Sequence, residues 1–412
     1  MTVQTEPKKP AASKKKKWTL PRHRIVTNLA RPIVRLLCKL RYNCDVVPFA
    51  EQGDRQYLIL ANHQTPFDQF YIVSAFKNAV YYVATEDLFS MGWVSDIIRF
   101  LVNPIAIRKQ GGDVKAVMNC IRVAREGGTI ALFPEGNRTY SGRTEHMSPA
   151  VVGLAKKLGL PIAIFRIEGG YGLEPRWSDV RRKGRMTAYV KEVIEPEEYK
   201  TMDDDAFYAR ITEALHVDEG CVSGTFPHKE RAQYLERAVY ICPNCGLATF
   251  ESHEDIVECK TCGRQVRYLP TKELEGVGFD FPFRFMTEWY DWQKDFINAL
   301  DTREYVDAPL YTDTVDVKEV IVFKCKKPLW NDAQMELYGD RVVIRGEETL
   351  VMPYEEVTAM SCMGRNKLNI YFGDRVFQIR GSKRFNALKY VNFCYRSKNI
   401  SKGDENGKFL GL

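Results

Sequence analysis

A histidine and an aspartate lie five positions apart in the stretch NHQTPFDQF, residues 62–70. The preceding apolar run YLILA predicts a buried strand that ends at Ala61, and Pro66 fits the first turn of a following helix, with Asp68 in that turn. A carboxylate can orient an imidazole and stabilise its protonated form while the ring takes a proton from a hydroxyl. His63 and Asp68 could do this chemistry, although a structural hydrogen bond would use the same two side chains.

A second polar turn follows the apolar residues of TIALFPEGNRTYSG, residues 129–142. It places Glu135, Gly136, Arg138 and Thr139 at a strand end, where α/β domains commonly bind ligands, although a solvated loop would read the same way. The stretch NPIAIRK brings Arg108 to another strand end. Its guanidinium is suited to pairing with phosphate oxygens.

Four of the eleven cysteines form a compact group with the pattern CPNCG at 242–246 and CKTCG at 259–263. Cys242, Cys245, Cys259 and Cys262 therefore have the spacing of a zinc ribbon, with iron as the lesser alternative. Four thiolates leave no open coordination position, so we expect a structural zinc and no catalytic cofactor.

The elements that must position these residues alternate between strand-like and helix-like patterns from about residue 42 to 215. Several strands are short continuous apolar runs, which is typical of a sheet covered by helices on both faces. The sequence therefore predicts an α/β fold with a mixed, largely buried sheet flanked by helices.

Downstream of that region, aromatic residues are frequent, and one helix is expected from about Pro282 to Leu300. The stretches MELYGDRVVI and NIYFGDRVFQI then each place Gly-Asp between alternating apolar residues, which predicts two hairpins. A helical pattern follows them, so we expect a small β-barrel-like domain with a final helix.

The order of these motifs resembles the glycerolipid acyltransferases, the family typified by 1-acylglycerol-3-phosphate (lysophosphatidic acid) acyltransferase. Its first block corresponds to Asn62 through Asp68, its third to FPEGNRT at 133–139, and its second to NPIAIR ending at Arg108. LPIAIFRIEG resembles the fourth block at Pro161, but the usual second proline is absent. The glycine common at the start of the second block is also absent, and both departures bear on the acceptor.

The resemblance implies an O-acyltransferase in which His63 is the general base and Asp68 orients it. Arg108, Glu135, Gly136, Arg138 and Thr139 would bind the glycerol phosphate. The acyl donor would be acyl-CoA or acyl-carrier protein, and the acceptor would be lysophosphatidic acid, which gives phosphatidic acid in phospholipid biosynthesis. The alternatives are the same chemistry on another lysolipid or glycerol 3-phosphate and, in a different class, a zinc-ribbon nucleic-acid-binding or scaffold protein. Acidic residues in the ribbon loop argue against nucleic acid.

The formal net charge of +7 is concentrated in the first 24 residues, which hold eight Lys and Arg and one Glu. This arm is either a solvated disordered tail or a segment attracted to anionic lipid or nucleic acid. The stretch RIVTNLARPIVRLLCKLRY fits a helix lying on an anionic membrane surface, and equally a helix packed on its own domain. We find neither a transmembrane run nor a signal peptide, and expect a cytoplasmic protein, peripheral on the inner face of a membrane.

The sequence thus predicts six regions. They are a basic arm (1–24), an acyltransferase domain with an N-terminal amphipathic helix (25–225), a zinc ribbon (236–270), an aromatic-rich connector (271–317), a β domain (318–400) and a tail (401–412). The β domain resembles pleckstrin-homology (PH) or GRAM domains in pattern alone. Its basic residues would contact either lipid headgroups or solvent.

Overall fold

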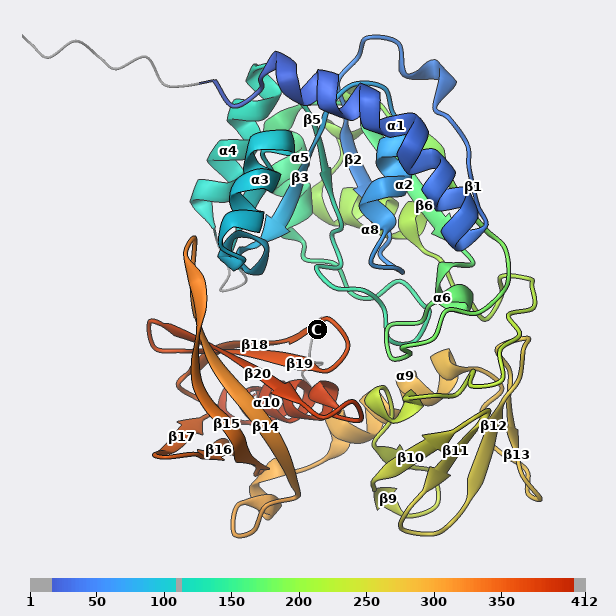
Figure 1. The fold of residues 1–412 in the computed structure, drawn as a ribbon, viewed down its shortest axis with the longest axis vertical. Coiled ribbons are helices and arrows are strands. Elements are labelled where there is room, and N and C mark those ends of the chain that lie inside the picture. Colours follow the sequence, from blue (N-terminus) through green and yellow to red (C-terminus); the bar gives the residue numbers. More distant parts are fainter. Residues whose placement is uncertain (1–16, 109–112, 404–412) are drawn as a thin grey trace, which may run out of the picture.

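The computed structural model describes residues 17–108 and 113–403 (Figure 1). Most of the predicted basic arm and the end of the predicted tail lie outside these residues. Figure 1 shows a sheet covered by helices at the top, a curled sheet at the lower left and a smaller sheet at the lower right. Within the described residues, no helix combines the length and apolar character needed to cross a bilayer.

The N-terminal part is built on a seven-stranded mixed sheet, as the sequence predicts. Its strands in spatial order are β1 (Cys44–Val46), β7 (Met186–Ile194), β6 (Ile162–Glu168), β2 (Leu58–Ala61), β5 (Thr129–Leu132), β3 (Val80–Thr85) and β4 (Ile105–Ile107). Every neighbouring pair is parallel except β6 and β7. β2 therefore lies centrally, and its carboxyl end lies beside that of β5.

Helices bury both faces of this sheet. The helices of this part are α1 (Pro21–Tyr42), α2 (Asp68–Ala75), α3 (Trp93–Val102), α4 (Val114–Arg125), α5 (Ala150–Leu158), α6 (Gly170–Leu173), α7 (Pro196–Tyr199) and α8 (Asp204–Leu215). Leu58 and Leu60 of β2 share a core with α4, α5 and α8, while Ile59 and Ala61 share one with α1 and α2. Alternate side chains thus enter two cores, which explains the continuous apolar run of this strand.

The helix after β2 begins two residues later than predicted. α2 begins at Asp68, and Pro66 lies in the turn before it. The Asp68 carboxylate accepts hydrogen bonds from the backbone N–H groups of Gln64 (2.6 Å) and Thr65 (3.0 Å). These bonds hold the chain in a turn up to the helix, so Asp68 occupies its first position.

The cysteine-containing part consists of short antiparallel strands. They are the hairpin β8 (Ile241–Cys242) and β9 (Gly246–Leu247), and the sheet β10 (Phe250–His253), β11 (Ile256–Cys259), β12 (Gln265–Tyr268) and β13 (Leu274–Gly276). The connector helix α9 spans Met286–Ala299 and is shorter than predicted at its N-terminus. The Glu288 carboxylate accepts hydrogen bonds from the backbone of Arg284 and Phe285, which caps the helix at this point.

The C-terminal part is a curled antiparallel sheet with one helix, α10 (Ala387–Ser401). Its strands in spatial order are β17 (Thr349–Pro353), β16 (Arg341–Arg345), β15 (Cys325–Leu337), β14 (Tyr311–Ile321), β20 (Arg375–Gly381), β19 (Lys367–Phe372) and β18 (Val357–Met363). Both Gly-Asp sequences lie in antiparallel hairpins, β15–β16 and β19–β20. This curled half-barrel agrees with the predicted β-barrel-like architecture.

The cysteine part, α9 and the C-terminal sheet pack on one continuous core. Trp289 of α9 is fully buried, donates a hydrogen bond from its indole N–H to the carbonyl of Ile241 (3.0 Å), and belongs to the same apolar cluster as Leu388 of α10. The predicted boundaries between these regions remain a prediction. The shared core joins the parts drawn in the lower half of Figure 1 and also includes Trp177 of the N-terminal part.

Candidate active site

His63 and Asp68 meet at the carboxyl end of β2. The strand delivers His63 to the edge of the sheet, the first turn of α2 presents Asp68, and His63 Nδ1 lies 2.7 Å from Asp68 Oδ2. The Asp68 side chain is completely buried, whereas the His63 side chain is 20% exposed. The structure therefore brings together the two residues predicted to be catalytic, with the imidazole on the solvent side.

The hydrogen bonds of Asp68 fix the tautomer of His63. Its carboxylate also accepts from the Thr65 hydroxyl (2.6 Å) and from backbone N–H groups, so both of its oxygens act as acceptors. Because an ionised carboxylate only accepts, Nδ1 of His63 carries the proton and Nε2 carries the lone pair. Within residues 17–108 and 113–403, no protein group hydrogen-bonds Nε2.

The surroundings of His63 favour its neutral form. Burial lowers the pKa of the imidazole below its ordinary value of 6.5; Asp68 acts in the opposite direction, and Arg138 and Arg176 lower the pKa further. The ring also stacks on Phe133, with centroids 4.3 Å apart. A neutral, oriented imidazole with a free lone pair can accept a proton at neutral pH.

Glu135 holds the backbone around His63. It is buried, and its two carboxylate oxygens accept hydrogen bonds from the backbone N–H groups of His63 (2.7 Å) and Glu145 (2.8 Å). Burial raises the pKa of this carboxyl well above its usual range. Its observed contacts thus position the histidine, while its predicted contact with substrate remains a prediction.

The rest of the FPEGNRT turn lies beside His63. Gly136 has a φ of +68°, a left-handed conformation that favours glycine, and the backbone N–H of Thr139 donates to the carbonyl of His63 (3.0 Å). Arg138 is the cation of this turn, and its Nη1 is buried without a hydrogen-bond partner. Burial lowers the pKa of Arg138 to about 10, and Arg176 and Arg365 act in the same direction.

Arg108 lies apart from these residues. It follows β4, which is separated from β2 by β5 and β3, so its backbone is about 14 Å from the β2 position at the usual strand spacing. Its side chain is exposed, and its backbone N–H donates to Asp113. In the described parts of the chain, no contact joins Arg108 to His63 or Arg138.

Two further arginines lie near Arg138; Arg176 was not identified from the sequence, and Arg365 was included only among the basic residues of the β domain. Arg176 follows α6 and is 1% exposed, and it donates to the carbonyls of Arg138 (2.8 Å), Cys362 (2.9 Å) and Gly364 (3.0 Å). Arg365, in the turn between β18 and β19, forms an ion pair with Glu174. Neither arginine belongs to a recognisable motif, so only the fold reveals them.

Apolar side chains of α1 point away from the protein. We define the outer apolar face as the exposed apolar residues of α1 and α3, two helices that contact each other: Ile25, Leu29, Ile33, Leu36, Leu37, Leu40, Trp93, Ile97 and Phe100. The opposite side of α1 buries polar or small side chains, including His23, Thr27 and Cys38. The two helices meet where Arg22 donates to the carbonyl of Phe100 (3.0 Å).

This orientation is the reverse of that of an ordinary surface helix, which turns its apolar side toward the core. Four cations of α1, Arg24, Arg35, Lys39 and Arg41, are also exposed. The sequence contained the α1 residues of the face, but it did not indicate that α3 adds Trp93, which is 72% exposed. Exposed apolar side chains concentrated on two neighbouring helices are typical of contact sites.

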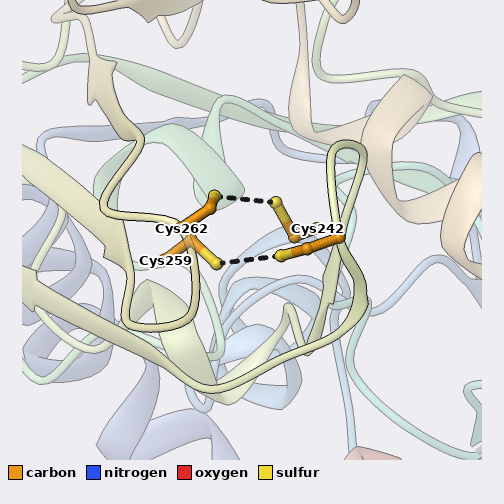
Figure 2. Close-up of side chains that lie close together, drawn as sticks. Cys242, Cys259 and Cys262 are labelled. Carbon is orange, nitrogen blue, oxygen red and sulfur yellow. Dashed lines mark hydrogen bonds between the residues drawn. The ribbon is translucent and has the colours of Figure 1, made fainter.

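The four predicted ligand cysteines lie close together (Figure 2). Their sulfur atoms all lie within 4.8 Å of one another, with 3.8 Å between Cys242 and Cys262 and 3.6 Å between Cys245 and Cys259. A tetrahedral zinc with Zn–S bonds of about 2.3 Å requires about 3.8 Å between sulfurs. The donor set and its spacing therefore suit a metal ion.

Comparison with known proteins places the N-terminal part of the chain. Residues 42–167 match the family model described as Acyltransferase. The curated 1-acyl-sn-glycerol-3-phosphate acyltransferase BAT2, chloroplastic, of Brassica napus is 20% identical over 201 residues, which cover 45% of this chain and 57% of that protein. The chain thus spans little more than half the length of this relative.

Two solved structures also show similarity. The 1-acyl-sn-glycerophosphate (LPA) acyltransferase PlsC of Thermotoga maritima has a TM-score of 0.38 at 21% identity, covering 47% of this chain and 76% of that one. The N-terminal PH domain of human ARAP2 has a TM-score of 0.18 at 11% identity, covering 22% of this chain and 80% of that one. Both TM-scores are too low to carry an argument, whereas the family match covers His63, Asp68 and the FPEGNRT turn. Residues 42–167, which hold the candidate catalytic pair, are therefore similar to the Acyltransferase family.

Proposed function

We propose that this protein transfers a fatty acyl group from acyl-CoA or acyl-carrier protein to the free hydroxyl of 1-acylglycerol 3-phosphate. The observation that carries the proposal is the buried Asp68 holding His63 Nδ1 at 2.7 Å, within a domain that matches the acyltransferase family. Another lysolipid or glycerol 3-phosphate remains an alternative acceptor for the same chemistry.

In this mechanism Nε2 of His63 takes the proton from the acceptor hydroxyl as its oxygen attacks the thioester carbonyl carbon. The tetrahedral intermediate then collapses, the carbon–sulfur bond breaks, and the thiolate takes the proton from the imidazolium. The products are an ester and a free thiol. Asp68 stabilises the imidazolium, and Glu135 acts as a positioning residue by holding the His63 backbone.

Arg138, Gly136 and Thr139 are proposed to bind the glycerol phosphate beside His63. Arg138 supports this role because its Nη1 is buried and free to donate. Arg108 follows β4, at a distance from His63 along the same edge of the sheet. There it would bind a distant part of a long acceptor or of the acyl donor. These roles follow the matching positions of the family motifs.

The outer apolar face supports a peripheral membrane location. Apolar side chains of α1 and α3 would enter the headgroup region, and the cations of α1 would pair with anionic lipids. A lysolipid acceptor resides in such a surface, so this location would supply the substrate. The four cysteines are proposed to hold a structural zinc ion.

The proposed reaction is tested with purified protein, palmitoyl-CoA and oleoyl-lysophosphatidic acid in liposomes. Release of free thiol should match the amount of phosphatidic acid formed. Parallel reactions with other lysolipids, glycerol 3-phosphate and palmitoyl-acyl-carrier protein identify the preferred pair. Absence of thiol release with every pair would contradict the proposal.

A further inference from the structure

The C-terminal sheet contacts the acyltransferase domain at the active site. The turn at residues 364–366, between β18 and β19, lies against the FPEGNRT turn, because Arg176 bonds the carbonyls of Gly364 and Arg138 with the same guanidinium. One guanidinium group is only a few ångströms wide, so the two turns that it joins are neighbours. The last residue bonded in this way, Cys362, belongs to β18 itself.

Three arginines from separate parts of the chain therefore surround one location. Arg138 comes from the turn after β5, Arg176 from the segment after α6, and Arg365 from the C-terminal sheet. Two carboxylates pair with Arg365: Glu174, which also accepts a hydrogen bond from the Tyr42 hydroxyl (2.7 Å), and Asp179 at 3.6 Å. The location thus carries an excess of positive charge next to His63.

The three arginines differ in how many of their N–H donors already have a hydrogen-bond partner. The three hydrogen bonds that Arg176 donates all end on backbone carbonyls, and its guanidinium lies over the Tyr140 ring, 4.4 Å from the centroid, so in the described residues no carboxylate forms an ion pair with it. Arg138 Nη1 is buried without a partner. Arg365 is partly exposed at 30% and has five N–H donors; Glu174 accepts from one of them, and Asp179 lies 3.6 Å from another nitrogen of its guanidinium.

We propose that Arg365 of the C-terminal sheet, together with Arg176, completes a site for the phosphate of the acceptor, so that the C-terminal domain selects acceptors with an anionic headgroup. This inference rests on the proposed function. A phosphate monoester carries about two negative charges near neutral pH and offers three oxygens to guanidinium donors. Arg365 is a binding residue in this account, and Arg176 both adds charge and locks the two turns together.

A purely structural ion pair between Arg365 and Glu174 would make a different prediction. If the pair only joined two domains, removal of either partner would have the same effect. If Arg365 binds phosphate, Glu174 competes with the ligand for its guanidinium. R365A should then weaken acceptor binding, whereas E174Q should leave it unchanged or strengthen it; the amide oxygen of Gln can still accept from Tyr42.

The experiment measures kcat and KM for lysophosphatidic acid and for palmitoyl-CoA in wild-type protein, R365A, R365K, E174Q and R375A. We expect R365A to raise the KM for lysophosphatidic acid by about ten- to a hundredfold, the usual value of a hydrogen bond between charged groups, without changing the KM for palmitoyl-CoA. R365K should restore part of the loss. R375A is the matched control, because Arg375 forms an exposed ion pair with Glu319 in the same sheet.

A second measurement does not depend on turnover. In the His63→Ala background, calorimetry with glycerol 3-phosphate should show affinity that falls by a similar factor in R365A. Equal affinity for glycerol 3-phosphate with and without Arg365 would overturn the inference. An equal rise of the acceptor KM in R365A and E174Q would also overturn it. In either case, transfer by the wild-type protein would still support the proposed function. Arg365-dependent phosphate binding without any transfer would instead support the site and contradict the proposed function.

Discussion

In the described residues, all hydrogen bonds of the Asp68 carboxylate are with residues 63–65. Asp68 therefore orients His63 and holds the turn that carries it. Replacing it with asparagine, D68N, removes the charge that stabilises the imidazolium and disturbs the tautomer of His63. We expect kcat to fall by about 10²- to 10⁴-fold, as for other histidines that lose their carboxylate. Loss of buried hydrogen bonds should also lower the free energy of unfolding by about 1–3 kcal/mol.

Steady-state kinetics and thermal denaturation separate these two effects. D96N is the control, because Asp96 is exposed at 68% and pairs with Arg99 on the surface of α3. A D68N variant with wild-type kcat would remove Asp68 from the mechanism.

The acid side of the pH profile reports the state of His63. Burial lowers the pKa of His63 from 6.5, and a protonated ring has no lone pair for the acceptor proton. The value of kcat/KM should therefore be constant near neutral pH and fall as the pH drops through a midpoint below 6.5. R138Q removes a cation that lowers this pKa, so its midpoint should lie at higher pH. A wild-type midpoint above 6.5 would contradict the proposed role.

The two catalytic candidates could be predicted because their types and spacing lie within one short motif. Glu135 was identified as well, but its contacts with backbone N–H groups depend on the adjacency of β2 and β5. Arg176 could not be predicted, and the sequence indicated Arg365 only as a basic residue of the β domain, not its position beside the acyltransferase domain. Arg365 and its partner Glu174 are 191 residues apart, and only the packing of two domains brings them together.

The apolar side chains of α1 and α3 are exposed, whereas most proteins bury such side chains. We therefore expect these two helices to contact the membrane. The double variant L29Q/W93S should reduce binding to vesicles that contain anionic lipid. Each side chain contributes about 1.5–3 kcal/mol if it is fully buried, so the combined loss should exceed about a hundredfold. Cosedimentation with vesicles measures the affinity.

The matched control is V351Q, because Val351 is 46% exposed on the C-terminal sheet, away from these helices. Equal vesicle binding by L29Q/W93S and the wild-type protein would exclude the outer apolar face as the contact surface. Added salt should weaken binding of the wild-type protein, since the cations of α1 contribute to it.

Most strands and helices followed from hydrophobic periodicity and turn residues. The starts of α2 and α9 did not, because they are set by backbone N–H groups that donate hydrogen bonds to the carboxylates of Asp68 and Glu288. The exposure of the apolar side chains of α3 could not be predicted from the sequence either. Its apolar residues would suit a buried helix equally well, and only its position in the fold leaves them uncovered.

In the molecule as a whole, the cysteine cluster supports a core that extends into the C-terminal sheet. Purified protein should contain about one zinc per chain, and C259S should lose the metal and lower the Tm, because a small ribbon depends on its metal for stability. C221S is the control, since Cys221 is exposed and outside the cluster. Elemental analysis and calorimetry give both values. Protein that lacks metal, with equal Tm in C259S and the wild-type, would contradict this role.

The three sheets were predictable as separate patterns, whereas their arrangement was not. The shared core around Trp289 and the contact at Arg176 both join segments that are distant in the sequence. Together they fix the β18–β19 turn beside the acyltransferase domain. The C-terminal part of the chain thus lies against the FPEGNRT turn, a contact that no local motif indicates.

The most direct test of the central claim compares acyl transfer by wild-type protein, H63A and H253A in the same liposomes. His253 is the control, because its side chain is 64% exposed on the cysteine part. The account predicts that H63A keeps the wild-type Tm and vesicle binding but loses measurable transfer, while H253A transfers at the wild-type rate. A folded H63A variant that forms phosphatidic acid at the wild-type rate would contradict general-base catalysis by His63.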